Sequence, residues 1–215
     1  MIAILTIEAS RADGLVIGED LGTVPNYVRK VLASHGVLGT VVEWFARVDD
    51  SPNAGDPYDD PTNYRKYALA SVTTHDLPPT AGYLQFEHVQ LRERLHLLTE
   101  SVESFQASAT AERQAMLDRL RTLGLISDEE ADDADSHIPQ IVEAMHAMLR
   151  KSPSLLIQAA LVDGVGERRT QNQPGTSDQY PNWRIPLADG EGNVVPLEKL
   201  FDEPRLQEIT AIMRG

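Results

Sequence analysis

The stretch Leu15–Pro25, LVIGEDLGTVP, decides how the fold of this chain is interpreted. It begins with an apolar run, and a short apolar run bounded by turn residues is typical of a buried parallel strand, so we expect a strand over residues 15–18. Glu19 and Asp20 follow where that strand ends, and parallel folds bind ligands at the carboxyl ends of their strands. Thr23 is expected to cap the next helix. This stretch alone leaves two interpretations open: a functional carboxylate, or two loop carboxylates stabilised by a helix N-terminus.

A second strand with a polar end lies within Ala70–Thr80, ASVTTHDLPPT. We expect a strand over residues 67–74, because the run contains β-prone residues and the prolines after it stop a strand. His75 and Asp76 then stand at its carboxyl end. Carboxylates at two strand ends suit the cleavage of glycosidic bonds, in which one carboxylic acid protonates the leaving oxygen and others carry or stabilise the positive charge at the sugar.

A third stretch, Asn172–Arg184, has the sequence NQPGTSDQYPNWR. Taken in order, the three stretches resemble the amylomaltases, the 4-α-glucanotransferases of glycoside hydrolase family 77, through the patterns V-I-G-E-D-L-G-T-V-P, T-H-D-L-P and N-x-P-G-T…Y-x-N-W-R. The resemblance extends over essentially the whole chain. It implies an α/β fold: the C-terminal half of a (β/α)8 TIM barrel, with a helical insertion between the last two strands.

The resemblance also implies roles for the strand-end residues. Glu19 is identified as the general acid/base, which must be protonated to give a proton to the glycosidic oxygen, so we expect it to be buried. Asp76 is identified as the carboxylate that stabilises the transition state, and His75 as a hydrogen-bond donor to the same sugar. Asp20 is expected to brace the loop or the next helix.

Further residues are candidates for contacts with the sugar. Asn172 is expected to meet sugar hydroxyls. Trp44 and Phe45 lie on a strand expected over residues 40–45, so one ring faces inward and the other outward. For these two rings, binding a glucose and packing in the core are equally open. Trp183 is interpreted as the structural anchor of its loop.

The composition suits an enzyme acting on neutral sugars, and the resemblance implies that these are α-1,4-glucans and maltooligosaccharides. The chain has 215 residues and a net charge of −14, and this acidic excess argues against nucleic-acid binding. It has no cysteine, which excludes disulfides and thiolate metal sites, and its acidic loop over residues 49–63 lacks the spacing of an EF-hand. No stretch approaches the length of a transmembrane helix. We expect a cytoplasmic protein with no metal or cofactor and no membrane partner.

The chain divides into three expected parts. Residues 1–86 carry barrel strands. Residues 87–151 contain Leu and Met stripes at helical spacing, which predict helices packed on one another, and a capping box at Ser127–Glu130. Residues 152–215 hold the last strand, the substrate loop and the C-terminal helices. The other elements expected are helices over 2–12, 25–35 and 196–215 and a strand over 155–161. The terminal side chains expected to be buried include Ile4, Leu5, Leu197, Leu200, Phe201 and Ile209.

One component implied by the resemblance is expected to be missing. The family's nucleophilic aspartate lies upstream of the acid/base strand, and no such motif precedes Glu19. We therefore expect the chain to be the C-terminal catalytic part of a longer 4-α-glucanotransferase, inactive alone, that works by a retaining double displacement. A related α-amylase-type hydrolase and a non-catalytic glucan-binding piece stay open as alternatives. Four strands cannot close a barrel of eight, so we expect a second copy or the chain's own helices to cover the open half.

Overall fold

A parallel sheet forms the centre of the chain, of which the computed structural model describes residues 1–22 and 24–215. Its strands are hydrogen-bonded in the order β1 (Gly39–Val42), β2 (Ala68–Ser71) and β3 (Leu156–Gln158). In this register, Gly39 pairs with Ala68, and Leu69 pairs with Leu156. Because all the strands run parallel, their carboxyl ends lie along one edge of the sheet, as the sequence predicts.

The stretch around Ile17 extends the sheet by one position. A single parallel bridge joins Ile17 to Leu38, next to the start of β1. Gly18 N donates to Leu38 O at 2.8 Å, and Leu38 N donates to Val16 O at 2.9 Å. The strand expected over residues 15–18 therefore lies at its expected place, but it is reduced to one bridge.

The strand expected over residues 40–45 is wrong in its second half. β1 ends at Val42, and the 3-10 turn η1 (Glu43–Phe45) follows it. This turn places the indole of Trp44 in the core with 1% of its surface exposed. Burial of such a large ring stabilises the turn more than three further residues of strand would stabilise the sheet.

The strands expected over residues 67–74 and 155–161 are likewise longer than β2 and β3. Residues after β3 form a helix instead, α8 (Leu161–Val165). Asp163 in this helix is fully buried, and its carboxylate accepts hydrogen bonds from Thr80 N at 2.8 Å and Thr80 Oγ1 at 2.7 Å. These bonds require the chain to turn inward at this point. Two further 3-10 turns, η2 (Val48–Asp50) and η3 (Pro61–Asn63), lie between β1 and β2.

The helices between β2 and β3 build most of the hydrophobic core. They are α3 (Thr80–Leu84), α4 (Glu87–Arg94), α5 (Val102–Thr122), α6 (Asp128–Asp132), η4 (Ala134–His137) and α7 (Ile138–Leu149). α7 is central, because eight of its 12 residues are buried and it packs against α3, α5, α10 and β2. The predicted stripes in α5 and α7 and the capping box of Ser127 and Glu130 are confirmed, whereas the stripe predicted over residues 91–98 runs past the end of α4 at Arg94.

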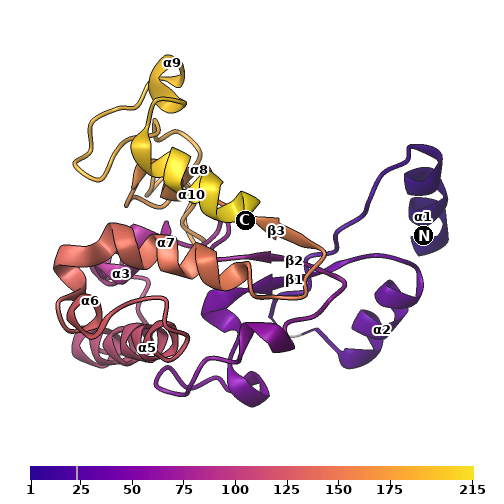
Figure 1. Cartoon of the computed structure of the whole chain (residues 1–215), viewed down its shortest axis with the longest axis horizontal. Coiled ribbons are helices and arrows are strands. Elements are labelled where there is room, and N and C mark those ends of the chain that lie inside the picture. The colour runs from indigo at the N-terminus through magenta and orange to yellow at the C-terminus, as the bar shows by residue number, and fades with distance from the viewer. Residues whose placement is uncertain (23) are drawn as a thin grey trace.

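Two helices near the N-terminus, α1 (Ile2–Arg11) and α2 (Asn26–Ser34), bury none of their residues. The expectation that Ile4 and Leu5 face inward is wrong: they are 66% and 48% exposed, because no described element covers them. In Figure 1 both helices lie on the other side of the sheet from α5, α6 and α7. The capping role expected of Thr23 falls outside the described residues.

The C-terminal helices are α9 (Leu197–Leu200) and α10 (Pro204–Arg214), and α10 packs against α7 and α8. Leu200 and Ile209 are buried as expected. Leu197 and Phe201 are 72% and 76% exposed, contrary to expectation, because the single turn of α9 presents only one side to the protein. Across residues 1–22 and 24–215, no helix combines the length and apolar character needed to cross a membrane.

Candidate active site

Asp76 and Asn172 meet beyond the carboxyl end of β2. Asn172 Nδ2 donates a hydrogen bond of 2.6 Å to Asp76 Oδ1, although the two residues are 96 positions apart. His75 Nε2 lies 3.4 Å from Asp76 Oδ2, and the side chains of His75 and Asp76 are 56% and 45% exposed. The structure thus brings together three of the residues predicted from sequence, at the edge where the sequence predicts a site. Their polar atoms are open to a ligand.

Trp183 is an aromatic residue of this site that the sequence analysis assigned to another role. Its ring centroid lies 5.7 Å from that of His75, and 62% of its surface is exposed. Only its backbone anchors the loop, through Trp183 N donating to Gln171 O at 2.8 Å. The proximity of an exposed ring to His75 and Asp76 depends on the course of the whole loop, which its sequence alone does not give.

The loop that carries Asn172 is held by buried polar groups. Glu167 is 1% exposed, and its carboxylate accepts hydrogen bonds from Arg169 and from Ala188 N. Burial alone would raise the pKa of Glu167, but the hydrogen bonds from Arg169 outweigh that effect and hold the pKa below its usual range. Thr170 Oγ1 donates to Asn172 O at 2.9 Å, which ties the site residue to this buried segment.

Two further ties hold the distal half of the loop. Tyr180 Oη donates to Thr170 O at 2.7 Å. Asn182 Oδ1 accepts from Gln173 N at 2.8 Å, while Asn182 Nδ2 donates to Thr176 Oγ1 at 2.9 Å. The backbone on both sides of Asn172 is therefore fixed by hydrogen bonds within the loop.

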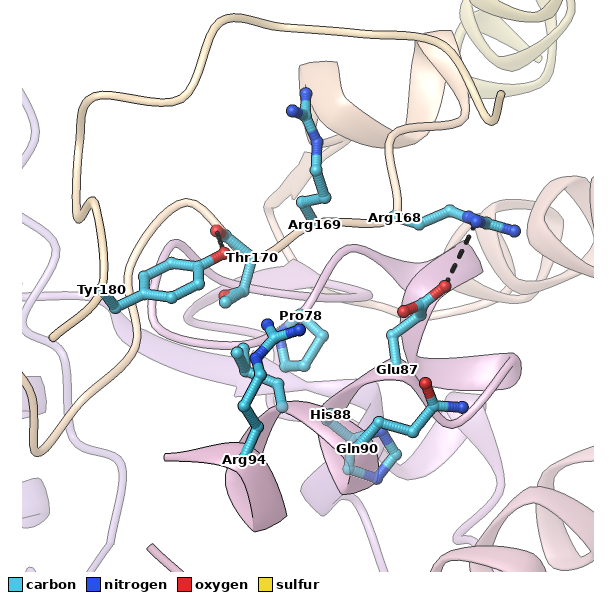
Figure 2. A pocket seen from close by; sticks show the side chains of 10 residues that line it. Pro78, Glu87, His88, Gln90, Arg94, Arg168, Arg169, Thr170 and Tyr180 are labelled. Carbon is cyan, nitrogen blue, oxygen red and sulfur yellow. Dashed lines mark hydrogen bonds and ion pairs between the residues drawn. The ribbon is translucent and has the colours of Figure 1, made fainter. Parts of the chain in front are cut away.

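A small cavity lies behind the site, between this loop and α4 (Figure 2). Its volume is about 70 Å³, enough for a few water molecules but not for a glucose ring. Figure 2 shows Arg94 pointing toward Pro78 and Thr170, whereas Arg168 reaches away to Glu87, 3.3 Å from it. Because the guanidinium groups of Arg94 and Arg168 do not converge, this cavity forms no anion site.

Glu19 differs from its expected environment. It follows the bridge at Ile17, but its side chain is exposed, so the expectation that it is buried is wrong for the described chain. No described element covers the loop at this point. No hydrogen bond or ion pair joins Glu19 to Asp76 among residues 1–22 and 24–215; the two share only the edge of the sheet at which their strands end.

Asp20 is the brace that the sequence predicts. It is 3% exposed, and its carboxylate is bound by Arg65 at 2.6 and 3.0 Å and by Thr40 N at 2.9 Å. Arg29 Nε lies 3.2 Å from Asp20 Oδ2, which links the loop to α2. Burial alone would raise the pKa of Asp20, but the hydrogen bonds from Arg65 and Thr40 outweigh it and lower the pKa to about 2.

Trp44 and Phe45 take opposite environments, as expected. Trp44 packs in the core, with its ring stacked on Tyr83 at 4.1 Å between centroids and edge-on to Tyr58 at 6.4 Å. A sugar cannot reach either face of this ring in the described structure, so the binding role considered for Trp44 gives way to core packing. Phe45 is 52% exposed and remains available for contacts.

A buried polar cluster beneath the carboxyl edge was not found from sequence. Glu43, at the end of β1, is fully buried, and neither carboxylate oxygen has a hydrogen-bond partner among the described residues. Burial, together with the nearby carboxylate of Asp163, raises the pKa of Glu43 well above its usual range. His146 Nε2 lies 3.8 Å from Asp163 Oδ2. The only signal in the sequence is a glutamate within the apolar run of residues 41–45.

The described residues contain no group of three or more His, Asp or Glu side chains that is placed to hold a metal ion. The groups that the site offers are carboxylates, an imidazole, an amide and exposed aromatic rings.

Comparison with known proteins assigns the chain to a family. The family model described as 4-alpha-glucanotransferase, glycoside hydrolase family 77, matches residues 1–190. A curated 4-alpha-glucanotransferase from Mycobacterium tuberculosis (strain H37Rv) is 47% identical over 215 residues, which is 100% of this chain and 29% of the relative. One from Haemophilus influenzae is 30% identical over 211 residues, 96% of this chain and 28% of the relative. The chain thus spans less than a third of the length of these relatives.

Two solved structures are similar to the chain. The crystal structure of amylomaltase from Corynebacterium glutamicum matches with a TM-score of 0.87 at 40% identity, over 98% of this chain and 30% of that one. The amylomaltase from Streptococcus agalactiae in complex with acarbose matches with a TM-score of 0.53 at 20% identity, over 99% of this chain and 34% of that one, a likeness that concerns the fold alone. With the family model matched over most of its length, the chain belongs to the 4-alpha-glucanotransferases of glycoside hydrolase family 77.

Proposed function

We propose that this chain is the C-terminal catalytic part of a 4-α-glucanotransferase, which moves segments of α-1,4-glucans between maltooligosaccharides. The observation that carries the proposal is the meeting of Asp76, His75 and Asn172 at the carboxyl edge of a parallel sheet. Membership of the family supports the choice of reaction. The exposed ring of Trp183 beside His75 supports a carbohydrate ligand, because sugars stack on exposed aromatic faces.

The proposed reaction is a retaining double displacement. In the first step, Glu19 gives a proton to the glycosidic oxygen as that bond breaks, and a carboxylate nucleophile forms a bond to the anomeric carbon. In the second step, Glu19 takes the proton of an acceptor 4-hydroxyl as this oxygen displaces the nucleophile. Asp76 stabilises the positive charge at the sugar in both steps. His75 donates a hydrogen bond to a sugar hydroxyl, Asn172 holds Asp76 and meets the same sugar, and Phe45 offers a further contact.

We propose that the nucleophile is not among the residues of this chain, because none of its aspartates lies in the motif expected to precede the acid/base strand. The covalent step then has no route, and the isolated chain should not disproportionate maltotriose. Incubation of the purified chain with maltotriose tests this by measuring glucose release. Release above the blank that Glu19→Gln abolishes would contradict it.

In a longer enzyme that contains this chain, Glu19→Ala is expected to lower kcat by about 10²- to 10⁴-fold, because it removes the proton transfer and little packing. Glu8→Ala is the matched control, since it removes an exposed carboxylate that pairs with Arg11 on the surface of α1. Turnover of maltotriose measures both. A Glu19→Ala variant that keeps the rate of Glu8→Ala would show that the acid/base lies elsewhere.

The Asn172→Ala variant tests whether Asn172 contributes to sugar binding and catalysis. Removal of the amide takes away the 2.6 Å hydrogen bond to Asp76, so both kcat and the affinity for maltotriose should fall. Asn193→Ala is the control, because this asparagine bonds only within the exposed turn around Asp189. Equal kinetics for the two variants would contradict the role proposed for Asn172.

The remaining proposals concern assembly and location. We propose that the sheet is half of a (β/α)8 barrel, with residues 87–151 as an insertion between residues 1–86 and 152–215. The exposed apolar side chains near its open edge, Leu15 and Ile17 among them, support association with a second copy. Light scattering after size exclusion tests this: a dimer is expected, and a monomer of 23.7 kDa would contradict it. We propose the cytoplasm as its location, in keeping with the absence of cysteine.

A further inference from the structure

A second and larger cavity lies between α2 and the amino ends of β1 and β2. Its volume is about 350 Å³, and its walls include Gly39 at the start of β1 and Tyr67 just before β2. Gly39 and Tyr67 stand at the amino ends of β1 and β2, whereas Asp76 follows the carboxyl end of β2, so the cavity is separate from the site at Asp76; of its walls, Asp20 directly follows Glu19. Its volume falls near the lower end of the range of small-molecule sites, about 300–1,000 Å³.

The charge of the cavity is opposite to that of the chain. Four cationic side chains, Arg29, Lys30, Arg65 and Lys66, line it together with the single carboxylate of Asp20, whereas the whole chain has a net charge of −14. Only four lysines occur in the sequence, and two of them are here. Such a concentration of one charge against a low-dielectric wall attracts anions.

Asp20 leaves part of this positive charge uncompensated. Its carboxylate pairs with Arg65 at 2.6 Å and with Arg29 at 3.2 Å. Lys30 and Lys66 have no carboxylate within 4.0 Å among the described residues, whereas Arg29 and Arg65 share the carboxylate of Asp20. Donors of this kind are suited to a phosphate group, which offers several acceptor oxygens.

The rest of the wall is apolar. Leu32, Ala33 and Val37 contribute aliphatic surface, and Tyr67 contributes a ring that is 61% exposed. Lys66 Nζ lies 5.8 Å from the centroid of that ring, so a cation stands beside the aromatic surface. A ligand with an anionic head and an apolar or ring-shaped body would satisfy both parts of the wall.

We propose that this cavity binds a small phosphate monoester with an apolar ring body. Lys30, Lys66 and Arg29 hold the phosphate, and Tyr67 and Leu32 contact the ring. None of these side chains takes part in the proposed glucan transfer, so the proposal stands or falls independently of it.

Isothermal titration of the full chain at low ionic strength tests the proposal with phenyl phosphate, inorganic phosphate and phenol. Phenyl phosphate should bind at least about fivefold more tightly than inorganic phosphate, phenol should give no measurable heat, and added salt should weaken the binding. Lys30→Ala and Lys66→Ala should each weaken phenyl phosphate about three- to fivefold. Lys151→Ala removes an exposed lysine outside the cavity and should change nothing.

A further variant gives an effect of opposite sign. Asp20→Asn removes the carboxylate that competes for Arg29 and Arg65, so phenyl phosphate should bind more tightly to it. If this variant does not fold, the Lys30→Ala and Lys66→Ala variants still test the proposal, because replacing these exposed lysines leaves the core unchanged. Absence of phenyl phosphate binding, equal affinities in Lys66→Ala and Lys151→Ala, or equal affinities for phenyl and inorganic phosphate would each overturn the proposal.

Discussion

The helices on the two sides of the sheet carry similar apolar residues but are held very differently. α7 buries Ile141, Met145 and Met148 completely, and it packs against three helices and a strand. α1 contains Ile4, Leu5 and Ile7, yet buries none of its residues. An apolar helix face indicates where a partner is needed, and the structure decides whether that partner is present. The stability of the described chain should therefore come from the side that contains α7.

The largest expected effect tests this difference directly. Met145→Ala in α7 removes a side chain with no exposed surface and should lower the free energy of unfolding by about 2–5 kcal/mol, through lost burial and the cavity left behind. Leu5→Ala in α1 should change it by less than about 0.5 kcal/mol. Urea unfolding of both variants measures the two values. Similar values would show that α1 is packed in solution.

A smaller effect concerns the ion pairs of Asp20, which hold the N-terminal side. Asp20→Asn should cost about 1–2 kcal/mol at pH 7, a value discounted because the side chain of Arg65 is 42% exposed. The pKa of Asp20 is about 2 when folded and about 3.9 when unfolded, so this stability is complete above pH 4 and is lost as the pH falls toward 2. Urea unfolding at pH 7 and pH 3 should show the gap between variant and wild type narrowing at pH 3. A gap independent of pH would rule out the ion pair as its source.

The smallest effect compares serines at helix ends on the two sides. Ser127 caps α6: Ser127 Oγ accepts from Glu130 N at 3.2 Å, and Ser127 N donates to Glu130 Oε2 at 2.7 Å. Ser127→Ala should cost about 1 kcal/mol. Ser34→Ala in α2 removes an exposed hydroxyl that donates to Val31 O and lies 3.2 Å from His35 Nδ1, and should be neutral within about 0.5 kcal/mol. Thermal unfolding distinguishes them, and equal shifts in Tm would contradict the comparison.

Local patterns predicted the parts of the fold that depend on neighbours in sequence. The capping box at Ser127 and the stripes of α5 and α7 are of this kind, and so are the strand ends that carry Asp76 and Asp20. Their partners lie within a few residues or follow from the general geometry of parallel strands. The order of the sheet also follows the order of the chain, which is the simplest arrangement for parallel units.

Features that depend on distant segments were not predicted. The turn at Trp44 depends on Tyr83, which lies 39 residues later, and the helix at Asp163 depends on Thr80, 83 residues earlier. In the site, the family pattern named Asp76 and Asn172 as contacts of the sugar, but no local pattern predicted the hydrogen bond between them. The exposure of Glu19 and of Trp183 depends on what covers them, and no local pattern carries that information.

The hydrogen bonds within the loop after α8 have a consequence for the thermodynamics of ligand binding. A free loop must lose about 1–2 kcal/mol of conformational entropy for each residue that a ligand orders. Around Asn172, the bonds from Thr170, Tyr180 and Asn182 have already fixed the backbone when the chain folds. A sugar that meets Asn172 and Asp76 would then lose mainly its own freedom, so the heat capacity and entropy of binding should resemble those of a rigid site and not those of coupled folding.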